Sequence, residues 1–175
     1  MTTRTAPFLA AAALLAAGCY AQVEEKSLVI RRPLGYTVDA ATSSVSLDLP
    51  DVNFDVGDIT IDGNSKDSQL TLKTATLILP NGAAASFSGI TGGVLEVSAP
   101  NDRSLAPVSL TYDKARDGPA DRTLVMSGSP DTNVLPYLQQ KTLSMHIRLV
   151  GQAPTTAWTA DIAIDFFLLG KIRFP

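Results

Sequence analysis

Apolar and polar residues alternate along most of the chain after residue 27, and two C-terminal runs show this most clearly. The first run places Leu143, Met145, Ile147 and Leu149 opposite Thr142, Ser144, His146 and Arg148. The second places Trp158, Ala160, Ile162, Ile164, Phe166 and Leu168 opposite Thr159, Asp161, Ala163 and Asp165. A period of two is typical of a β-strand that buries one face. Because a turn at 151–154 separates the runs, we predict that they pair as a central β-hairpin.

Shorter runs of the same kind predict further strands. Turn signals such as Asp62-Gly63-Asn64 and Pro80-Asn81-Gly82 separate them, and Pro50 ends one of them. A short helical turn is predicted only within 131–140, where Asp131 can act as the N-cap. The shorter strands are expected at 28–31, 36–39, 45–49, 52–61, 69–79, 84–88, 94–98, 108–112 and 123–127. This pattern predicts an all-β fold, an antiparallel β-sandwich of the immunoglobulin-like or jelly-roll kind, with a small β-barrel as the alternative.

Segment 69–79 changes phase within itself. Leu70 and Leu72 share one parity, whereas Ala75, Leu77 and Leu79 share the other. A slip of one residue turns every side chain to the opposite face of a strand. We therefore predict a β-bulge or bend between Lys73 and Ala75.

The last run loses its polar face at its end, where Phe167 and Leu169 are apolar. We predict that the sandwich covers this part of the strand on both sides. A contact between this strand end and a partner is the alternative.

The N-terminal segment indicates export. A single basic residue, Arg4, precedes an apolar run at 8–17, which is shorter than the about 20 residues that cross a bilayer. Such a segment is typical of a secretory signal. Its end, Leu14-Leu15-Ala16-Ala17-Gly18-Cys19, resembles the lipobox of bacterial lipoproteins, although Ala16 stands where the commonest pattern has Leu. The resemblance implies cleavage before Cys19, a diacylglycerol thioether on that cysteine and an amide-linked third chain.

The resemblance divides the chain into a signal peptide at 1–18, a short tether at 19–26 and one domain at 27–175. A tether of that length reaches at most about 25 Å, at about 3.3–3.6 Å per residue, so we expect the domain to stand near the membrane. By the sorting pattern of such lipoproteins, Tyr20 after the cysteine favours the outer membrane. The alternative is an ordinary signal cut after Ala21, which would give a secreted or periplasmic protein.

Composition and charge argue against nucleic acid and anionic lipid as partners and exclude an intramolecular disulfide. The formal net charge is −3, and 18% of residues are charged. The sequence lacks the clustered basic residues that bind nucleic acid or anionic lipid. Cys19 is the only cysteine, so an intramolecular disulfide is excluded and the exported domain must depend on its core.

Two features of the sequence resemble chemical sites. Asp51, Asn53, Asp55 and Asp62 occupy the oxygen-ligand positions of a calcium loop, but Val56 stands where that loop requires glycine. We therefore predict an ordinary strand there and no metal. The only histidine, His146, could serve as a general base, but its place on a polar face predicts a solvent-facing residue.

Two segments have the composition of loops. Residues 113–122 carry the densest charge, which predicts a solvated loop, with a recognition loop as the alternative. Residues 89–93 are rich in glycine and are predicted to form a flexible turn. No nucleophile-elbow, zinc-protease or P-loop motif occurs, so we expect no catalytic residue and no cofactor.

These observations lead to three hypotheses. The first is a non-catalytic, membrane-anchored lipoprotein that binds or scaffolds another envelope component, a protein or a glycan. The second is a lipoprotein carrier of a small ligand or glycan, which would need an apolar pocket. The third is a hydrolase built on clustered carboxylates or on His146.

Overall fold

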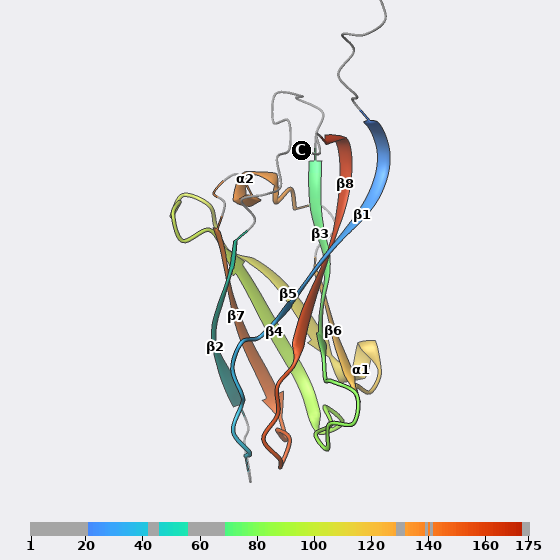
Figure 1. The fold of residues 1–175 in the computed structure, drawn as a ribbon, viewed down its shortest axis with the longest axis vertical. Coiled ribbons are helices and arrows are strands. Elements are labelled where there is room, and N and C mark those ends of the chain that lie inside the picture. Colours follow the sequence, from blue (N-terminus) through green and yellow to red (C-terminus); the bar gives the residue numbers. More distant parts are fainter. Residues whose placement is uncertain are drawn as a thin grey trace, which may run out of the picture.

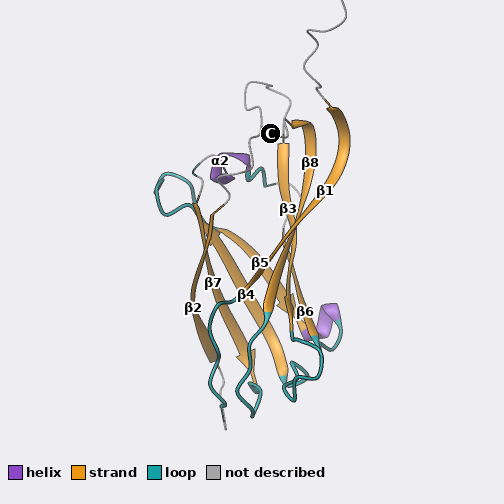
Figure 2. Cartoon of the chain, viewed as in Figure 1, coloured by secondary structure: helices purple, strands orange, loops and turns teal. Residues whose placement is uncertain are grey.

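The structure is a computed structural model that describes residues 21–41, 46–55, 69–128, 132–138, 140 and 142–172 (Figure 1). The described part is almost entirely strand, with two single-turn helices, α1 (Lys114–Asp117) and α2 (Leu135–Leu138) (Figure 2). The strands are β1 (Ala21–Pro33), β2 (Ser46–Asp55), β3 (Gln69–Ile78), β4 (Ile90–Ser98), β5 (Val108–Asp113), β6 (Thr123–Gly128), β7 (Thr142–Gly151) and β8 (Asp161–Ile172). Every pair of neighbouring strands is antiparallel, which confirms the predicted fold class.

The strand pairing is nested, as in a long hairpin folded over on itself. β1 pairs with β8, β2 with β7, β3 with β6 and β4 with β5, and the full order is β1-β8-β3-β6-β5-β4-β7-β2. At the centre of this order, β5 and β6 share only the pairs Leu110↔Gly128 and Thr111↔Ser127. The sheet folds at this weak seam into two layers, which is the jelly-roll form of a sandwich (Figure 1).

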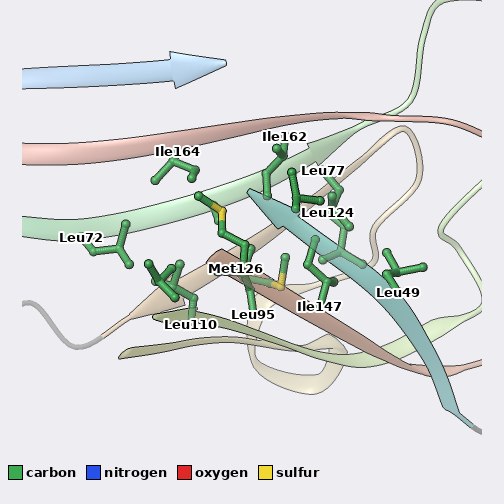
Figure 3. Packing of buried hydrophobic residues seen from close by; sticks show 14 of the residues in the cluster. Leu49, Leu72, Leu77, Leu95, Leu110, Leu124, Met126, Ile147, Ile162 and Ile164 are labelled. Atoms are coloured by element: carbon green, nitrogen blue, oxygen red, sulfur yellow. The ribbon is translucent and has the colours of Figure 1, made fainter. Parts of the chain in front are cut away.

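The core lies between the two layers and consists of the inward-facing residues of each strand. Leu72, Leu77, Ile162 and Ile164 come from one layer, and Leu95 and Ile147 from the other (Figure 3). All of these side chains are buried. Full burial of such a side chain contributes about 1.5–3 kcal/mol, so the two apolar faces account for much of the stability that a chain without disulfides needs.

An aromatic pair extends the core toward the loops between strands. The rings of Phe87 and Trp158 meet edge to face with centroids 5.3 Å apart. Backbone hydrogen bonds between Val38 and Trp158 hold the indole in place. The indole Nε1 is buried without a partner among the described atoms, which opposes folding by about 1–3 kcal/mol. The apolar contacts of the ring must outweigh that cost.

For the C-terminal hairpin, the predicted buried faces of the two strands are confirmed, but the predicted pairing between the strands is wrong. The inward residues of 143–149 and 158–168 are buried as predicted. However, β7 pairs with β2 and β4, whereas β8 pairs with β1 and β3. Residues 152–160 carry the chain from one layer to the other. Alternation determines which face of a strand is buried, but it carries no information about the neighbouring strand.

The bulge predicted in β3 is confirmed. The pairing of β3 with β8 shifts register between Leu72 and Thr74, so that Lys73 is the extra residue. Leu72 and Ala75 are both buried, although three positions separate them, and Lys73 is exposed. The Lys73 ammonium lies 4.9 Å from the centre of the Phe167 ring and covers part of that outer-face aromatic.

A second bulge was not predicted. Pro50 does not end a strand: β2 continues through it to Asp55, and the register against β7 shifts between Leu49 and Val52. Pro50 and Asp51 together lie opposite His146. Because β2 is an edge strand, the missing N–H of Pro50 removes no bond from the sheet.

Several predicted boundaries also differ. Residues 21–26, assigned to a tether, belong to β1, where 21–23 and 26 pair with β8 and the register shifts between Val23 and Lys26. Residues 36–39 form only the isolated bridge Val38↔Trp158, and 84–88 form no strand. The glycine-rich stretch is not a turn, because β4 begins at Ile90 and includes Gly92 and Gly93. The helical turn is confirmed as α2, where Asn133 rather than Asp131 accepts the Leu135 N–H, and Asp131 lies outside the described residues.

Candidate functional site

The two ends of the sandwich carry different loops (Figure 1). One end, called the α1 end, bears α1 and residues 34–41, 79–89 and 152–160. The opposite end, called the α2 end, bears α2, residues 99–107 and the start of β1. Cys19, the predicted lipidation site, lies outside the described residues, as does the part of the calcium-loop sequence from Val56 to Asp62. Residues 51–55 of that sequence are strand, as the favoured alternative predicted.

His146 belongs to a charged cluster on the outer face of β2 and β7, together with Asp48, Asp51 and Arg148. His146 Nδ1 lies 2.9 Å from Asp51 Oδ1, and its Nε2 lies 3.7 Å from Asp48 Oδ1. The bulge at Pro50 allows both carboxylates to face outward although they are three positions apart. The imidazole is 40% exposed, so the histidine faces solvent as predicted while it pairs with the two carboxylates.

The other charges of the cluster are also paired. Arg148 Nε donates to Asp48 Oδ1 at 2.6 Å, and this hydrogen bond lowers the pKa of the Asp48 carboxyl. The Tyr36 hydroxyl donates to the Pro50 carbonyl at 3.0 Å, and partial burial, followed by the nearby Asp51 charge, raises the pKa of Tyr36. Exposed ion pairs are screened by water and contribute little to stability. The cluster therefore links the edge strand β2 to β7 but adds little to the stability of their pairing.

The cluster does not have the geometry of a nucleophilic site. A histidine held by a carboxylate can act as a base, but nucleophilic catalysis also needs a hydroxyl or thiol within reach of that base. In the described part of the chain, no serine, threonine or cysteine side chain hydrogen-bonds to His146. The shallow hollow of about 150 Å³ beside it is lined by Val94, Glu96, His146 and Arg148.

The charged loop 113–122 is largely hydrogen-bonded to itself. Asp113 caps α1 by accepting the Ala115 N–H, and the Asp117 carboxylate accepts the Asp113 N–H at 2.8 Å. Arg116 donates to both oxygens of Asp117, at 2.7 and 2.8 Å. The Tyr112 hydroxyl joins the two ends of the turn, because it donates to Gly118 O and accepts from Ala120 N. Such a loop is already ordered before any partner arrives.

The remaining charges of this loop brace the neighbouring loop 79–89. Lys114 Nζ donates to Ser88 O at 2.8 Å, and Asp121 Oδ1 accepts from the Ser86 hydroxyl at 2.6 Å. Arg122 Nη1 donates to Ala83 O at 2.5 Å. The two loops thus form one structural unit at the α1 end.

We expect the Asp117 contacts to make stability depend on acid pH. The hydrogen bonds from Arg116, and then the one from Asp113, lower the pKa of Asp117 from 3.8 to about 2. A lowered folded-state pKa contributes stability that is complete above the unfolded value and is lost as pH falls through the folded value. The difference in melting temperature between wild type and Asp117→Asn should therefore be constant above pH about 5 and shrink between pH about 4 and about 2.

A matched control for this prediction is Asp39→Asn. It removes an exposed carboxylate that makes no hydrogen bond or ion pair with described residues. A difference for Asp117→Asn that stays constant down to pH about 2 would show that the carboxylate contributes nothing through its charge.

A cavity of about 240 Å³ opens at the α1 end, between the loops 79–89 and 152–160. Residues 84–86, 88 and 89 line one side, and residues 152–156 line the other. The lining is mainly polar, and its hydroxyl and amide side chains come from Ser86, Ser88, Gln152, Thr155 and Thr156. Its buried apolar residues are Ala85, Ala153 and Pro154.

Close backbone packing fixes the base of this cavity. Gln152 N donates to Gly89 O at 2.9 Å, and a Cβ placed on Gly89 would lie 2.5 Å from Gln152 O. A Cβ on Gly151, where φ is +117°, would lie 2.6 Å from Gly89 O. Only glycine fits at these two positions, because any side chain would prevent the close contact between the two backbone segments. Sequence analysis did not identify this cavity, because uncharged serine, threonine and glutamine in loops carry no motif.

Comparison with known proteins gives no functional assignment. No protein-family model and no curated protein matches the sequence. Among solved structures, the BFDV capsid protein, solved as a decamer, matches at 12% identity and a TM-score of 0.39, over 85% of this chain and 99% of that one. A mud crab tombus-like virus structure matches at 9% identity and a TM-score of 0.37, over 100% and 92% of the two chains. The tobacco streak virus coat protein matches at 11% identity and a TM-score of 0.28, over 80% and 85%.

At such identities and TM-scores, these likenesses carry no inference about function, and the jelly-roll assignment rests on the strand order. Among the described helices, none has the length and apolar character needed to cross a bilayer.

Proposed function

We propose that the protein is a non-catalytic, lipid-anchored module of the bacterial cell envelope, whose sandwich binds or braces another envelope component. The observation that carries this proposal is the position of the lipobox cysteine. Only Tyr20 separates Cys19 from Ala21, the first residue of β1. The anchor and the folded domain are therefore almost adjacent in the sequence.

This adjacency shortens the predicted tether of residues 19–26 to a mount of two residues, 19 and 20, before β1. Ala21 is already paired with Ile172 of β8. At about 3.3–3.6 Å per residue, the Cα atom of Cys19 lies within about 7 Å of that of Ala21. Lipid on Cys19 would thus place the α2 end of the sandwich against the membrane.

The same mount would direct the α1 end away from the membrane. β1 has 13 residues and runs from one end of the sandwich to the other, a span of roughly 40 Å at about 3.3 Å per residue. Contact with a component beyond the lipid surface would then fall to the loops of the α1 end. The filled interior (Figure 3) supports binding at the surface over carriage of an apolar ligand inside. By the sorting pattern, the proposed location is the outer membrane.

Photocrosslinking in intact cells tests the proposed function. A benzophenone amino acid at Thr155 samples the α1 end, and the same residue at Arg103 samples the α2 end. We expect Thr155 to give a discrete adduct with an envelope component and Arg103 to give lipid adducts. If Thr155 and the outer-face positions Ser109 and Val125 all yield no adduct, the binding or bracing role is wrong.

A further inference from the structure

We propose that the cavity at the α1 end binds a neutral saccharide end group. This inference rests on the proposed function, because the mount at Cys19 is what turns the cavity toward the space beyond the membrane. It goes further by assigning a site and a ligand class. The residues that carry it are Ser88, Gln152, Thr155 and Thr156, together with the buried lining residues Ala85 and Pro154.

The lining is mainly polar, with a smaller apolar part, and a sugar ring offers matching groups. A pyranose presents hydroxyls around its edge and apolar C–H groups on its faces. In the cavity, the hydroxyl and amide side chains of Ser88, Gln152, Thr155 and Thr156 belong to exposed residues, whereas the apolar residues Ala85, Ala153 and Pro154 are buried. The side chains of Gln152, Thr155 and Thr156 make no hydrogen bond to any described residue, so their donors and acceptors are available to a ligand.

The absence of charge in the lining narrows the ligand class. All ten lining residues are uncharged. Two charged side chains bond to lining residues and serve the protein itself, because the Lys114 ammonium donates to Ser88 O and the Asp121 carboxylate accepts from Ser86. Phosphate, carboxylate and ammonium ligands therefore have no charged partner in the cavity. A neutral polyhydroxyl ligand satisfies the groups that are present.

Size and order support a small, preformed site. The volume of about 240 Å³ is below the about 300–1,000 Å³ of pockets that enclose drug-sized ligands, and it suits one sugar ring. The backbone contact of Gly89 with Gln152 fixes the base, while Lys114 and Asp121 hold the loop on one side. A rim that is ordered in advance loses little conformational entropy when a ligand binds.

Saturation-transfer NMR on the full lipidated protein in nanodiscs tests the site. The probes are glucose, galactose, mannose and N-acetylglucosamine, with glucuronate as the charged counterpart, followed by an array of neutral bacterial envelope saccharides. Thr155→Trp fills the rim, and Thr123→Trp makes the same change at an exposed position on β6 as the matched control. We expect at least one neutral saccharide to bind, with affinity lowered by about tenfold or more in Thr155→Trp and unchanged in Thr123→Trp.

Three results would overturn the proposal: no neutral saccharide of the panel or the array binds, the two tryptophan variants bind alike, or glucuronate binds more tightly than glucose. Melting curves show that each variant is folded before its binding is scored. Lipid labelling of the same preparations separates the two proposals. Protein that is lipidated but binds no saccharide contradicts only the cavity assignment, whereas protein without lipid contradicts the anchored function.

Discussion

Replacing Cys19 with serine is expected to abolish lipid incorporation completely, because the thioether needs the sulfur. Each methylene buried in the bilayer contributes about 0.8 kcal/mol to membrane binding. One acyl chain therefore binds a protein to the membrane only marginally, whereas two or three chains hold the protein there firmly. A second variant joins the mature chain, from Tyr20 onward, to a cleavable secretory signal and so lacks the cysteine. This protein should appear in the soluble fraction. Metabolic labelling with an alkyne fatty acid and fractionation of the cells measure both results.

The neighbouring residue supplies the control. Tyr20→Asp keeps the cysteine and should keep the full lipid label, while the sorting pattern predicts that this variant moves from the outer to the inner membrane. Intact mass provides the decisive result for the wild type. A mature protein that begins at Gln22 without lipid would show that an ordinary signal peptidase cuts the chain, and the proposed mount at the α2 end would be lost with the anchor.

The faces of the strands were predictable because burial leaves a local trace in the sequence. Leu143, Ile147, Ile162 and Phe166 are all buried where alternation placed them. The pairing was not predictable, since β7 and β8 are adjacent in sequence but lie in different layers. Each of these strands has two other neighbours that cover its edges, and no residue within the strand reports which neighbours they are.

The bulges in β3 and β2 show that a change in the parity of apolar residues can reveal a bulge. In β3, the step from Leu72 to Ala75 reverses this parity and predicts the bulge. In β2, the step from Leu49 to Val52 is the same signal, but Pro50 between them is also a typical strand end. On an edge strand proline removes no hydrogen bond from the sheet, so the parity change was the stronger indicator.

For the site, charge was a poor guide. The loop 113–122 drew attention because of its charged residues, yet those residues order the turn and brace the adjacent loop. The cavity that they help to support is lined by uncharged residues from two segments that are distant in sequence, 84–89 and 152–156. The pairing of β4 with β7 brings these segments together. Because that pairing is non-local, only the structure reveals the cavity.

Replacing Gly151 with alanine is expected to lower the free energy of unfolding by about 2–6 kcal/mol, the sum of backbone strain and overpacking. Gly151 has φ +117°, which L-residues rarely adopt. A Cβ there would lie 2.6 Å from Gly89 O and 2.8 Å from Thr91 N. Because both are backbone atoms of the facing segment, relief of the clash requires β4 and β7 to move apart where they pair. Urea unfolding of wild type and variant, analysed with the slope held in common, measures the loss.

Gly82→Ala separates the two causes. Gly82 also has a positive φ, +79°, but a Cβ added there meets nothing within 4 Å. This variant carries only the strain of the left-handed conformation, about 1–2 kcal/mol, so the excess loss in Gly151→Ala measures the steric contact between β4 and β7. If the two alanine variants lose the same free energy, the close approach of Gly151 to Gly89 does not constrain the fold. The contact that defines the base of the cavity would then be loose enough to accept a side chain, and the site would not be preformed.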